Sequence, residues 1–107
     1  MKRGDLVSIA LQGDYGKPRP ALVIQSNFFA AHPSITVLPL TSAHRELPLF
    51  RIPVEPSPVN GLAKMSDVMV DKCMTVRREK VGGLIGRLED ERMVEITRAL
   101  AVFLGIG

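Results

Sequence analysis

The spacing of apolar residues changes once along this chain, near residue 90, and that change sets the fold class. Before it, apolar residues alternate with polar ones at period two or form short unbroken runs, which is typical of β-strands. After it, apolar residues recur at the helical spacing of Met93, Ile96, Leu100 and Phe103. Asp90 is the predicted N-cap of this helix, and Gly105 ends it. The chain therefore combines several short strands with one C-terminal helix.

Turn-forming residues separate the strand candidates, which span residues 4–12, 21–26, 34–42, 47–54, 64–76 and 82–88. Gly13 to Pro18 form a loop, and Ser26 is expected to cap a short helical turn. The continuous apolar run at 21–26 predicts a strand that is buried on both faces. Pro39 requires an edge position or a bulge, so we expect the strand at 34–42 to be irregular near that residue.

These elements predict a mainly β (α+β) fold in the form of a small, strongly bent barrel, because no pair of strands brackets a long helix. At 107 residues the chain is predicted to be one domain, residues 1–107. The helix carries apolar residues beyond one stripe, among them Val94, Ala101, Val102 and Leu104. It is therefore either deeply buried or in contact with a second subunit.

The composition limits the cellular compartment and the kinds of partner that we expect. The net charge of +3 and the sequence pI of about 9.4 are compatible with a polyanionic partner. Cys73 is the single cysteine, which excludes an internal disulfide and favours a reducing compartment. No stretch approaches the roughly 20 apolar residues of a membrane span, and the N-terminal apolar stretch is too short for a signal peptide. We expect a soluble, cytoplasmic protein with no membrane partner.

The motifs of the common catalytic sites are missing from the sequence. It has no metal-ligand spacing of cysteine and histidine, no nucleophile elbow and no phosphate loop, so we expect neither a metal nor another cofactor. His32 and His44 fall in predicted loops, where a solvated side chain is the usual explanation. Cys73 has no nearby histidine and is predicted to be a small core residue.

The loop before the buried strand places Arg19 between Pro18 and Pro20, and Lys17 lies just before them. The prolines fix the backbone, and the guanidinium has a planar fork that suits phosphate oxygens. A solvated surface loop and a phosphate-binding site both fit this pattern.

Three other polar groups also leave two interpretations open. Thr41 and Ser42 end a predicted strand and could form only a turn cap. Asp71 and Lys72 fall in the strand at 64–76, where a cross-strand ion pair is the usual explanation. A basic cluster follows and could be a phosphate-binding surface or a solvated face; its members are Arg77, Arg78, Lys80 and Arg87.

Taken in order, several segments resemble the MazF/PemK family of toxin endoribonucleases: RGDLVSI, RPALVIQS, VLPLTS, SDVMVDKCMTV and IGRL, followed by an amphipathic helix. The resemblance covers nearly the whole chain. It implies an SH3-like barrel of five to seven strands with a C-terminal helix. It also implies a homodimer that cleaves single-stranded RNA at short sequences and is inhibited by a cognate antitoxin.

The resemblance further implies that Arg19 and Thr41 form the catalytic pair, with Asp71 as a third candidate. An arginine that some members carry two residues before this aspartate is Met69 here, and the first loop has no histidine. The residues expected to bind RNA are Lys17, Ser42, Lys72, Arg77, Arg78 and Lys80. The expected reaction is a metal-independent transesterification by the 2′-hydroxyl of the RNA, which many members of the family carry out.

Two other functions compete with this one. Gyrase poisons of the CcdB family share the barrel but engage the topoisomerase through a tryptophan near the C-terminus, and this chain has no tryptophan. An SH3-like adaptor for proline-rich peptides needs an aromatic-lined groove, which one tyrosine and four phenylalanines supply poorly. The sequence therefore favours the endoribonuclease.

Overall fold

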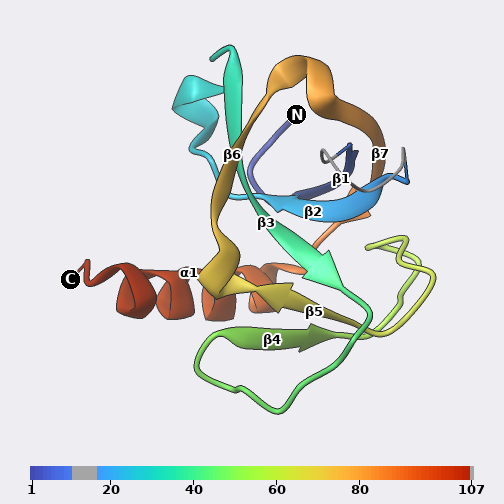
Figure 1. Cartoon of the computed structure of the whole chain (residues 1–107), viewed down its shortest axis with the longest axis vertical. Coiled ribbons are helices and arrows are strands. Elements are labelled where there is room, and N and C mark those ends of the chain that lie inside the picture. Colours follow the sequence, from blue (N-terminus) through green and yellow to red (C-terminus); the bar gives the residue numbers. More distant parts are fainter. Residues whose placement is uncertain (11–16, 107) are drawn as a thin grey trace.

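The computed structural model describes residues 1–10 and 17–106 and shows a strongly bent antiparallel sheet with a helix at the C-terminal end (Figure 1). The strands are β1 (Asp5–Ile9), β2 (Arg19–Val23), β3 (Ser34–Thr41), β4 (Arg51–Val54), β5 (Ser66–Met69), β6 (Met74–Arg77) and β7 (Val81–Arg87). Three short 3-10 turns, η1 (Asn27–Phe29), η2 (Val70–Lys72) and η3 (Arg78–Lys80), and the helix α1 (Asp90–Leu104) complete the fold.

The mainly β class and the C-terminal helix are therefore confirmed. Ser26 caps η1 as expected, since its hydroxyl accepts the Phe28 N–H at 3.2 Å. The last two residues of the predicted strand at 4–12, and residues 13–16 of the predicted loop, lie outside the described residues. Within the described stretches, no helix has both the length and the apolar character that crossing a lipid bilayer demands.

β3 lies at the centre of the sheet, whose strand order is β4-β5-β3-β2-β1-β7 with β6 also paired to β3. β6 pairs with the first half of β3 as far as Val37, and β5 pairs with its end from Leu40 onward. Pro39 lies between these two stretches. The expected irregularity of β3 is wrong, because the strand runs unbroken from Ser34 to Thr41 and the break falls in its partners instead.

β2 is buried on both faces, as its unbroken apolar run predicts. Leu22 and Ile24 contribute to a core that also contains Ile96 of α1. Ala21 and Val23 point to the other face and contribute to a second core. The bent sheet therefore packs against apolar side chains on both sides of β2.

The single strand predicted at 64–76 is wrong, because the structure divides it into β5, η2 and β6. β5 and β6 pair with different stretches of β3, and Pro39 separates those stretches. Proline has no N–H to donate, so the ladder on the β5 and β6 side of β3 is interrupted at Pro39, although the other side of β3 still pairs Pro39 with Ala21. The chain passes Pro39 in the turn η2. Asp71 and Lys72 therefore lie in a turn and not in the strand in which they were expected.

α1 begins at Asp90, so the predicted N-cap is wrong by one residue. The residue at the N-cap position is Glu89, whose carboxylate accepts the Ser57 hydroxyl at 2.6 Å instead of a helix N–H. The predicted end is confirmed. Gly105 has a φ of 72°, and two N–H groups beyond the helix close it by bonding to carbonyls of its last turn, from Gly105 to Val102 and from Ile106 to Ala101.

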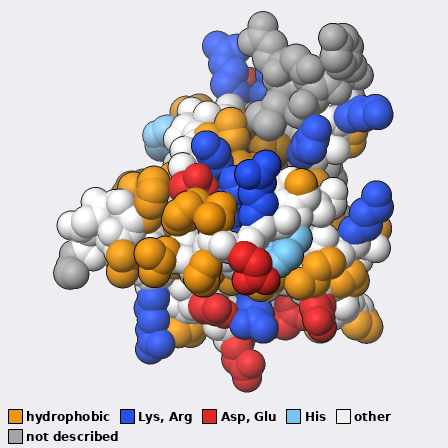
Figure 2. All heavy atoms as spheres, turned by 60° about the horizontal axis from the view of Figure 1, so that its bottom comes forward, with side chains coloured by type: hydrophobic (Ala, Val, Ile, Leu, Met, Phe, Trp, Pro, Cys, Tyr) orange, Lys and Arg blue, Asp and Glu red, His pale blue; other side chains and the backbone are white. Residues whose placement is uncertain are grey.

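Much of the apolar surface of α1 is exposed. Within the helix Ile96 alone is fully buried, while Met93 and Leu100 are partly buried against the core. Phe103, expected on the inward face, is 50% exposed, and four other apolar side chains of the helix and the residues after it are exposed as well: Val94, Val102, Leu104 and Ile106. Figure 2 shows hydrophobic side chains gathered at the end of the molecule where the C-terminus lies. Deep burial of the helix is therefore excluded within this chain.

Candidate active site

Arg19 and Thr41 lie on neighbouring strands at the same edge of the sheet. Arg19 is the first residue of β2 and Thr41 the last residue of β3. The antiparallel register pairs Ala21 with Pro39, which lie two residues from Arg19 along β2 and two residues from Thr41 along β3. The two predicted catalytic residues therefore lie at the adjoining ends of neighbouring strands.

Both side chains line a cleft of about 580 Å³, and Asp71 of η2 lines it with them. The other lining residues are Pro39, Leu40, Met69, Lys72, Cys73 and Met74. Three elements that are distant in sequence thus bring an arginine, a threonine and an aspartate together. Lysine and arginine side chains also gather near the middle of the face seen in Figure 2.

Asp71 pairs with a residue that the sequence did not single out. Its Oδ1 lies 3.5 Å from Arg51 Nε of β4, and its Oδ2 lies 3.8 Å from Lys72 Nζ. The side chains of Arg51 and Asp71 are 13% and 17% exposed, and neither of the two facing atoms makes a hydrogen bond within the described residues. Asp71 Oδ1 is therefore a buried acceptor that faces Arg51 and makes no hydrogen bond within the described residues.

A second hollow of about 350 Å³ adjoins the cleft, and both are lined by Arg19 and Leu40. Lys17 and Ser42, both predicted to bind RNA, lie in its lining, as does Lys64, which the sequence analysis missed. Lys72, also predicted, lines the cleft itself. Positive charge therefore continues from the cleft into the hollow beside it.

The remaining predicted RNA-binding residues lie at the end of β6 and in η3. Arg77 ends β6, whereas Met74, which begins it, lines the cleft. Arg77 and Lys80 are exposed. Arg78 instead fastens η3 to the turn after η1, because its guanidinium donates to the carbonyls of Ala30 and His32. Its role within the chain is thus structural.

Two predictions for single residues are wrong. Cys73 is not in the core but exposed beside the cleft, since η2 ends there and turns it outward. Partial burial of the sulfur raises the pKa of its thiol. His44 is not simply solvated, because its Nδ1 lies 2.7 Å from Oδ1 of the buried Asp67. That hydrogen bond, and a weaker one to Glu46, raise the pKa of His44.

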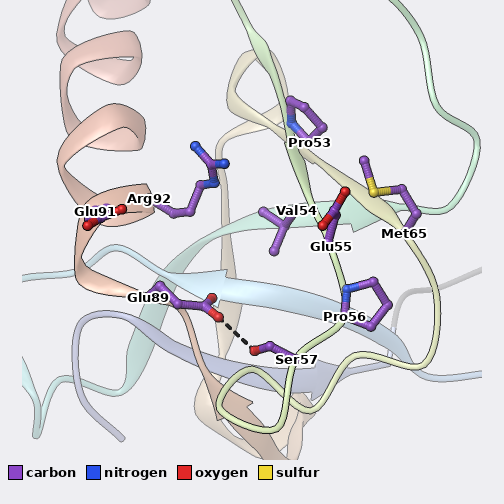
Figure 3. Close-up of a pocket in the computed structure, with 9 residues that line it drawn as sticks. All are labelled: Pro53, Val54, Glu55, Pro56, Ser57, Met65, Glu89, Glu91 and Arg92. Atoms are coloured by element: carbon purple, nitrogen blue, oxygen red, sulfur yellow. Dashed lines mark hydrogen bonds between the residues drawn. The ribbon is translucent and has the colours of Figure 1, made fainter.

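Another hollow, of about 370 Å³, lies between the end of β4 and the start of α1 (Figure 3). Glu55, Glu89 and Glu91 line it, with Arg92 as the one basic residue. The bond from Ser57 to Glu89 lowers the pKa of this carboxyl and keeps it ionised. The excess of negative charge repels a polyanion, so this hollow does not suit nucleic acid.

Several solved structures share this fold. An endoribonuclease in complex with its cognate antitoxin, from a mycobacterial species, has a TM-score of 0.82 at 24% identity, covering 100% of this chain and 97% of that one. The Mycobacterium tuberculosis toxin MazF-mt6 has a TM-score of 0.79 at 27% identity, covering 95% of this chain and 98% of that one.

Sequence comparison gives the family itself. The model for the PemK-like, MazF-like toxins of type II toxin-antitoxin systems matches residues 2–104. The probable endoribonuclease MazF of Mycolicibacterium smegmatis is 48% identical over 108 residues, covering 100% of this chain and 99% of that protein. This chain belongs to the PemK-like, MazF-like toxin family, which confirms the resemblance found in the sequence.

Proposed function

We propose that this chain is the endoribonuclease toxin of a type II toxin-antitoxin system and that it cleaves single-stranded RNA in the cleft of Arg19, Thr41 and Asp71. The observation that carries the proposal is the convergence of these three side chains from β2, β3 and η2 on one cleft. The relative named a probable endoribonuclease supports RNA cleavage over gyrase poisoning, since it matches the chain from end to end.

The proposed reaction is a transesterification. The 2′-oxygen of the RNA attacks the adjacent phosphorus, the bond from phosphorus to the 5′-oxygen breaks, and the products end in a 2′,3′-cyclic phosphate and a 5′-hydroxyl. The 2′-hydroxyl loses its proton and the leaving 5′-oxygen gains one. Because the nucleophile belongs to the substrate, no metal-activated water is required. Nor do the described residues contain three or more His, Cys, Asp or Glu side chains grouped so that they could hold a metal ion.

Arg19 is suited to stabilise the charge that builds on the non-bridging oxygens of the phosphate. Its guanidinium stays protonated and offers two parallel donors, so it is a strong electrostatic group and a poor general base. Thr41, on the neighbouring strand, positions the phosphate or the 2′-hydroxyl through its own hydroxyl. Asp71 either accepts the proton from the 2′-hydroxyl or orients Arg19, and its place in the lining of the cleft beside Arg19 and Thr41 supports both roles.

The basic residues around the cleft are assigned to the RNA backbone. Lys72 in the cleft and Lys17 and Ser42 in the adjoining hollow would contact phosphates next to the cut. Arg77 at the end of β6 and Lys80 of η3 would contact the RNA farther from the cut. Arg78 is a weaker candidate than the sequence suggests, since its guanidinium already binds two backbone carbonyls.

Two partners complete the proposal. The exposed apolar side chains of α1 are of the kind that a homodimer covers, because a single chain leaves them open to water. A cognate antitoxin with an acidic or amphipathic segment would bind over the basic cleft and exclude RNA. The mycobacterial endoribonuclease of the same fold is in complex with its cognate antitoxin, which supports this assignment.

The proposal is tested by incubating the purified protein with a long RNA and, separately, with relaxed DNA and gyrase. We expect RNA fragments with defined ends that carry a 5′-hydroxyl, and no effect on the gyrase reaction. If gyrase were trapped on the DNA and the RNA stayed intact, the protein would be a topoisomerase poison and not a nuclease.

A further inference from the structure

Asp67 is the one charged side chain among the described residues that is buried, and it lies beside the candidate active site. It belongs to β5 and is registered opposite Thr41 of β3. Side chains opposite each other in an antiparallel pair have Cβ atoms about 5 Å apart. A carboxylate in this position must be hydrogen-bonded or paired, because burying an unpaired charge is costly. Its partners therefore bear on the structure around Thr41.

Both oxygens of Asp67 bind the turn that follows Thr41. Oδ1 lies 2.7 Å from His44 Nδ1, and Oδ2 accepts the Arg45 N–H at 2.9 Å. Within the same turn the Ala43 N–H donates to Thr41 Oγ1 at 3.2 Å. The Thr41 hydroxyl is thus hydrogen-bonded within a turn that Asp67 of the neighbouring strand β5 holds in place.

The strength of this arrangement depends on the charge of His44. The charged groups that face its imidazole are Asp67 from β5 and, 3.5 Å from Nε2, Glu46 from its own turn. A protonated imidazole gives the buried carboxylate a counter-charge. A neutral imidazole still donates through Nδ1 but without that charge, so the bond is weaker.

We propose that Asp67 and His44 are positioning residues, which hold the Thr41 hydroxyl in place through the turn at residues 42–46. Both act through Thr41 and not on the RNA. The catalytic consequence rests on the proposed function. Because the pKa of His44 is higher in the folded chain than the ordinary 6.5, the turn is held most tightly below about pH 6.5 and loosens as the pH rises through the raised value.

Two substitutions of His44 separate the effect of its hydrogen bond to Asp67 from the effect of its charge. His44→Asn places an amide donor near the position of Nδ1 without a charge, and His44→Ala removes the donor. Asp67→Asn removes the carboxylate, but its buried position puts folding at risk, so the half-exposed His44 carries the main test. His32→Ala is the matched control, because His32 is the other histidine and its Nδ1 accepts an N–H in its own turn, from Ser34.

The first measurement is hydrogen exchange at the Ala43 and Arg45 amides, expressed as protection factors. In the wild type we expect protection that declines as the pH rises through the raised pKa of His44. His44→Ala should lower it about tenfold, the loss that corresponds to a bond of roughly 1.4 kcal/mol. His44→Asn should give intermediate protection without the pH dependence, and His32→Ala should leave it unchanged. Unaltered protection in His44→Ala would overturn the proposal.

The second measurement is RNA cleavage, resolved into kcat and KM. A hydroxyl displaced by about 1 Å lowers kcat by up to about 100-fold, so we expect a 10- to 100-fold loss in His44→Ala with KM unchanged and a partial rescue in His44→Asn. Loss of protection with an unchanged kcat would show that the turn does not position Thr41. A wild-type protein that leaves RNA intact would sink the proposed function, while the exchange experiment would still decide whether Asp67 and His44 hold Thr41.

Discussion

Arg51 and Asp71 face each other where β4 meets η2, with Nε and Oδ1 3.5 Å apart and both side chains largely buried. Removing the charge of one partner leaves the other poorly compensated. We expect Asp71→Asn to lower the free energy of unfolding by about 1–3 kcal/mol, between the values for exposed and fully buried pairs. Urea denaturation measures this directly. A stability equal to that of the wild type would mean that the pair contributes nothing to folding.

The same pair separates a role of Asp71 in the reaction from a purely structural role. Arg51→Met should destabilise the chain by a similar amount and leave the carboxylate in the cleft. If Asp71 takes part in the reaction, kcat falls more in Asp71→Asn than in Arg51→Met. Equal values of kcat in the two variants would leave Asp71 a structural residue only.

Arg19→Ala and Thr41→Ala should each abolish most of the activity without unfolding the chain. Loss of one preorganised donor typically lowers the rate by about 10²–10³. Arg19 is exposed and Thr41 ends its strand, so the circular dichroism spectrum and the urea midpoint should stay close to the wild type. Arg77→Ala is the matched comparison, because Arg77 is an exposed arginine at the far end of β6 that is assigned to the RNA backbone alone, so its loss should lower activity far less. A loss of cleavage activity in Arg77→Ala as large as that in Arg19→Ala would mean that the active site does not lie in the cleft.

Cys73 offers a probe of the cleft that requires no mutation. It is the single cysteine, it is exposed, and it lines the cleft. We expect an RNA whose 2′-hydroxyl is blocked at the cut to slow its alkylation several-fold. Burial raises the pKa of the thiol, so the labelling is followed at about pH 8.5 or above, where more thiolate is present. Labelling at the same rate with saturating RNA would place the RNA elsewhere.

Gly86 marks a close approach between β7 and the turn that contains Asn60. A Cβ at Gly86 would lie 2.3 Å from the Asn60 carbonyl oxygen, so backbone must move to admit it. We expect Gly86→Ala to cost about 3 kcal/mol of the free energy of unfolding. Gly83→Ala in the same strand is the control, since its Cβ would meet no described atom within 4 Å, and it should change stability by less than about 1 kcal/mol. Equal losses of stability in Gly86→Ala and Gly83→Ala would show that the close approach of Asn60 is not what requires glycine at residue 86.

The sequence predicted those parts of the fold and site that depend on local signals. The apolar run at β2 predicted a strand buried on both faces, and Gly105 predicted the end of the helix. The catalytic candidates Arg19 and Thr41 were proposed from short motifs, and the pairing of β2 with β3 brings both to the same edge of the sheet, where they line one cleft.

What the sequence missed depends on contacts between distant segments. Pro39 was expected to disturb its own strand, but it divides the partner strands instead, and η2 results. His44 looked like a loop histidine, because its partner Asp67 lies on β5. Arg51 carried no motif at all, since its importance arises only when β4 packs beside η2. No period or motif in a single segment reports such pairs.

The central claim is that the cleft uses the RNA's own 2′-hydroxyl as the nucleophile. It is tested most directly with one oligonucleotide in two forms, which differ only in a 2′-deoxy sugar on the nucleotide 5′ to the cut, each with and without EDTA. We predict that the all-ribose strand is cleaved equally in both conditions, leaving a 2′,3′-cyclic phosphate, and that the substituted strand stays intact. Cleavage of the 2′-deoxy strand at an undiminished rate, or loss of all cleavage in EDTA, would contradict the account.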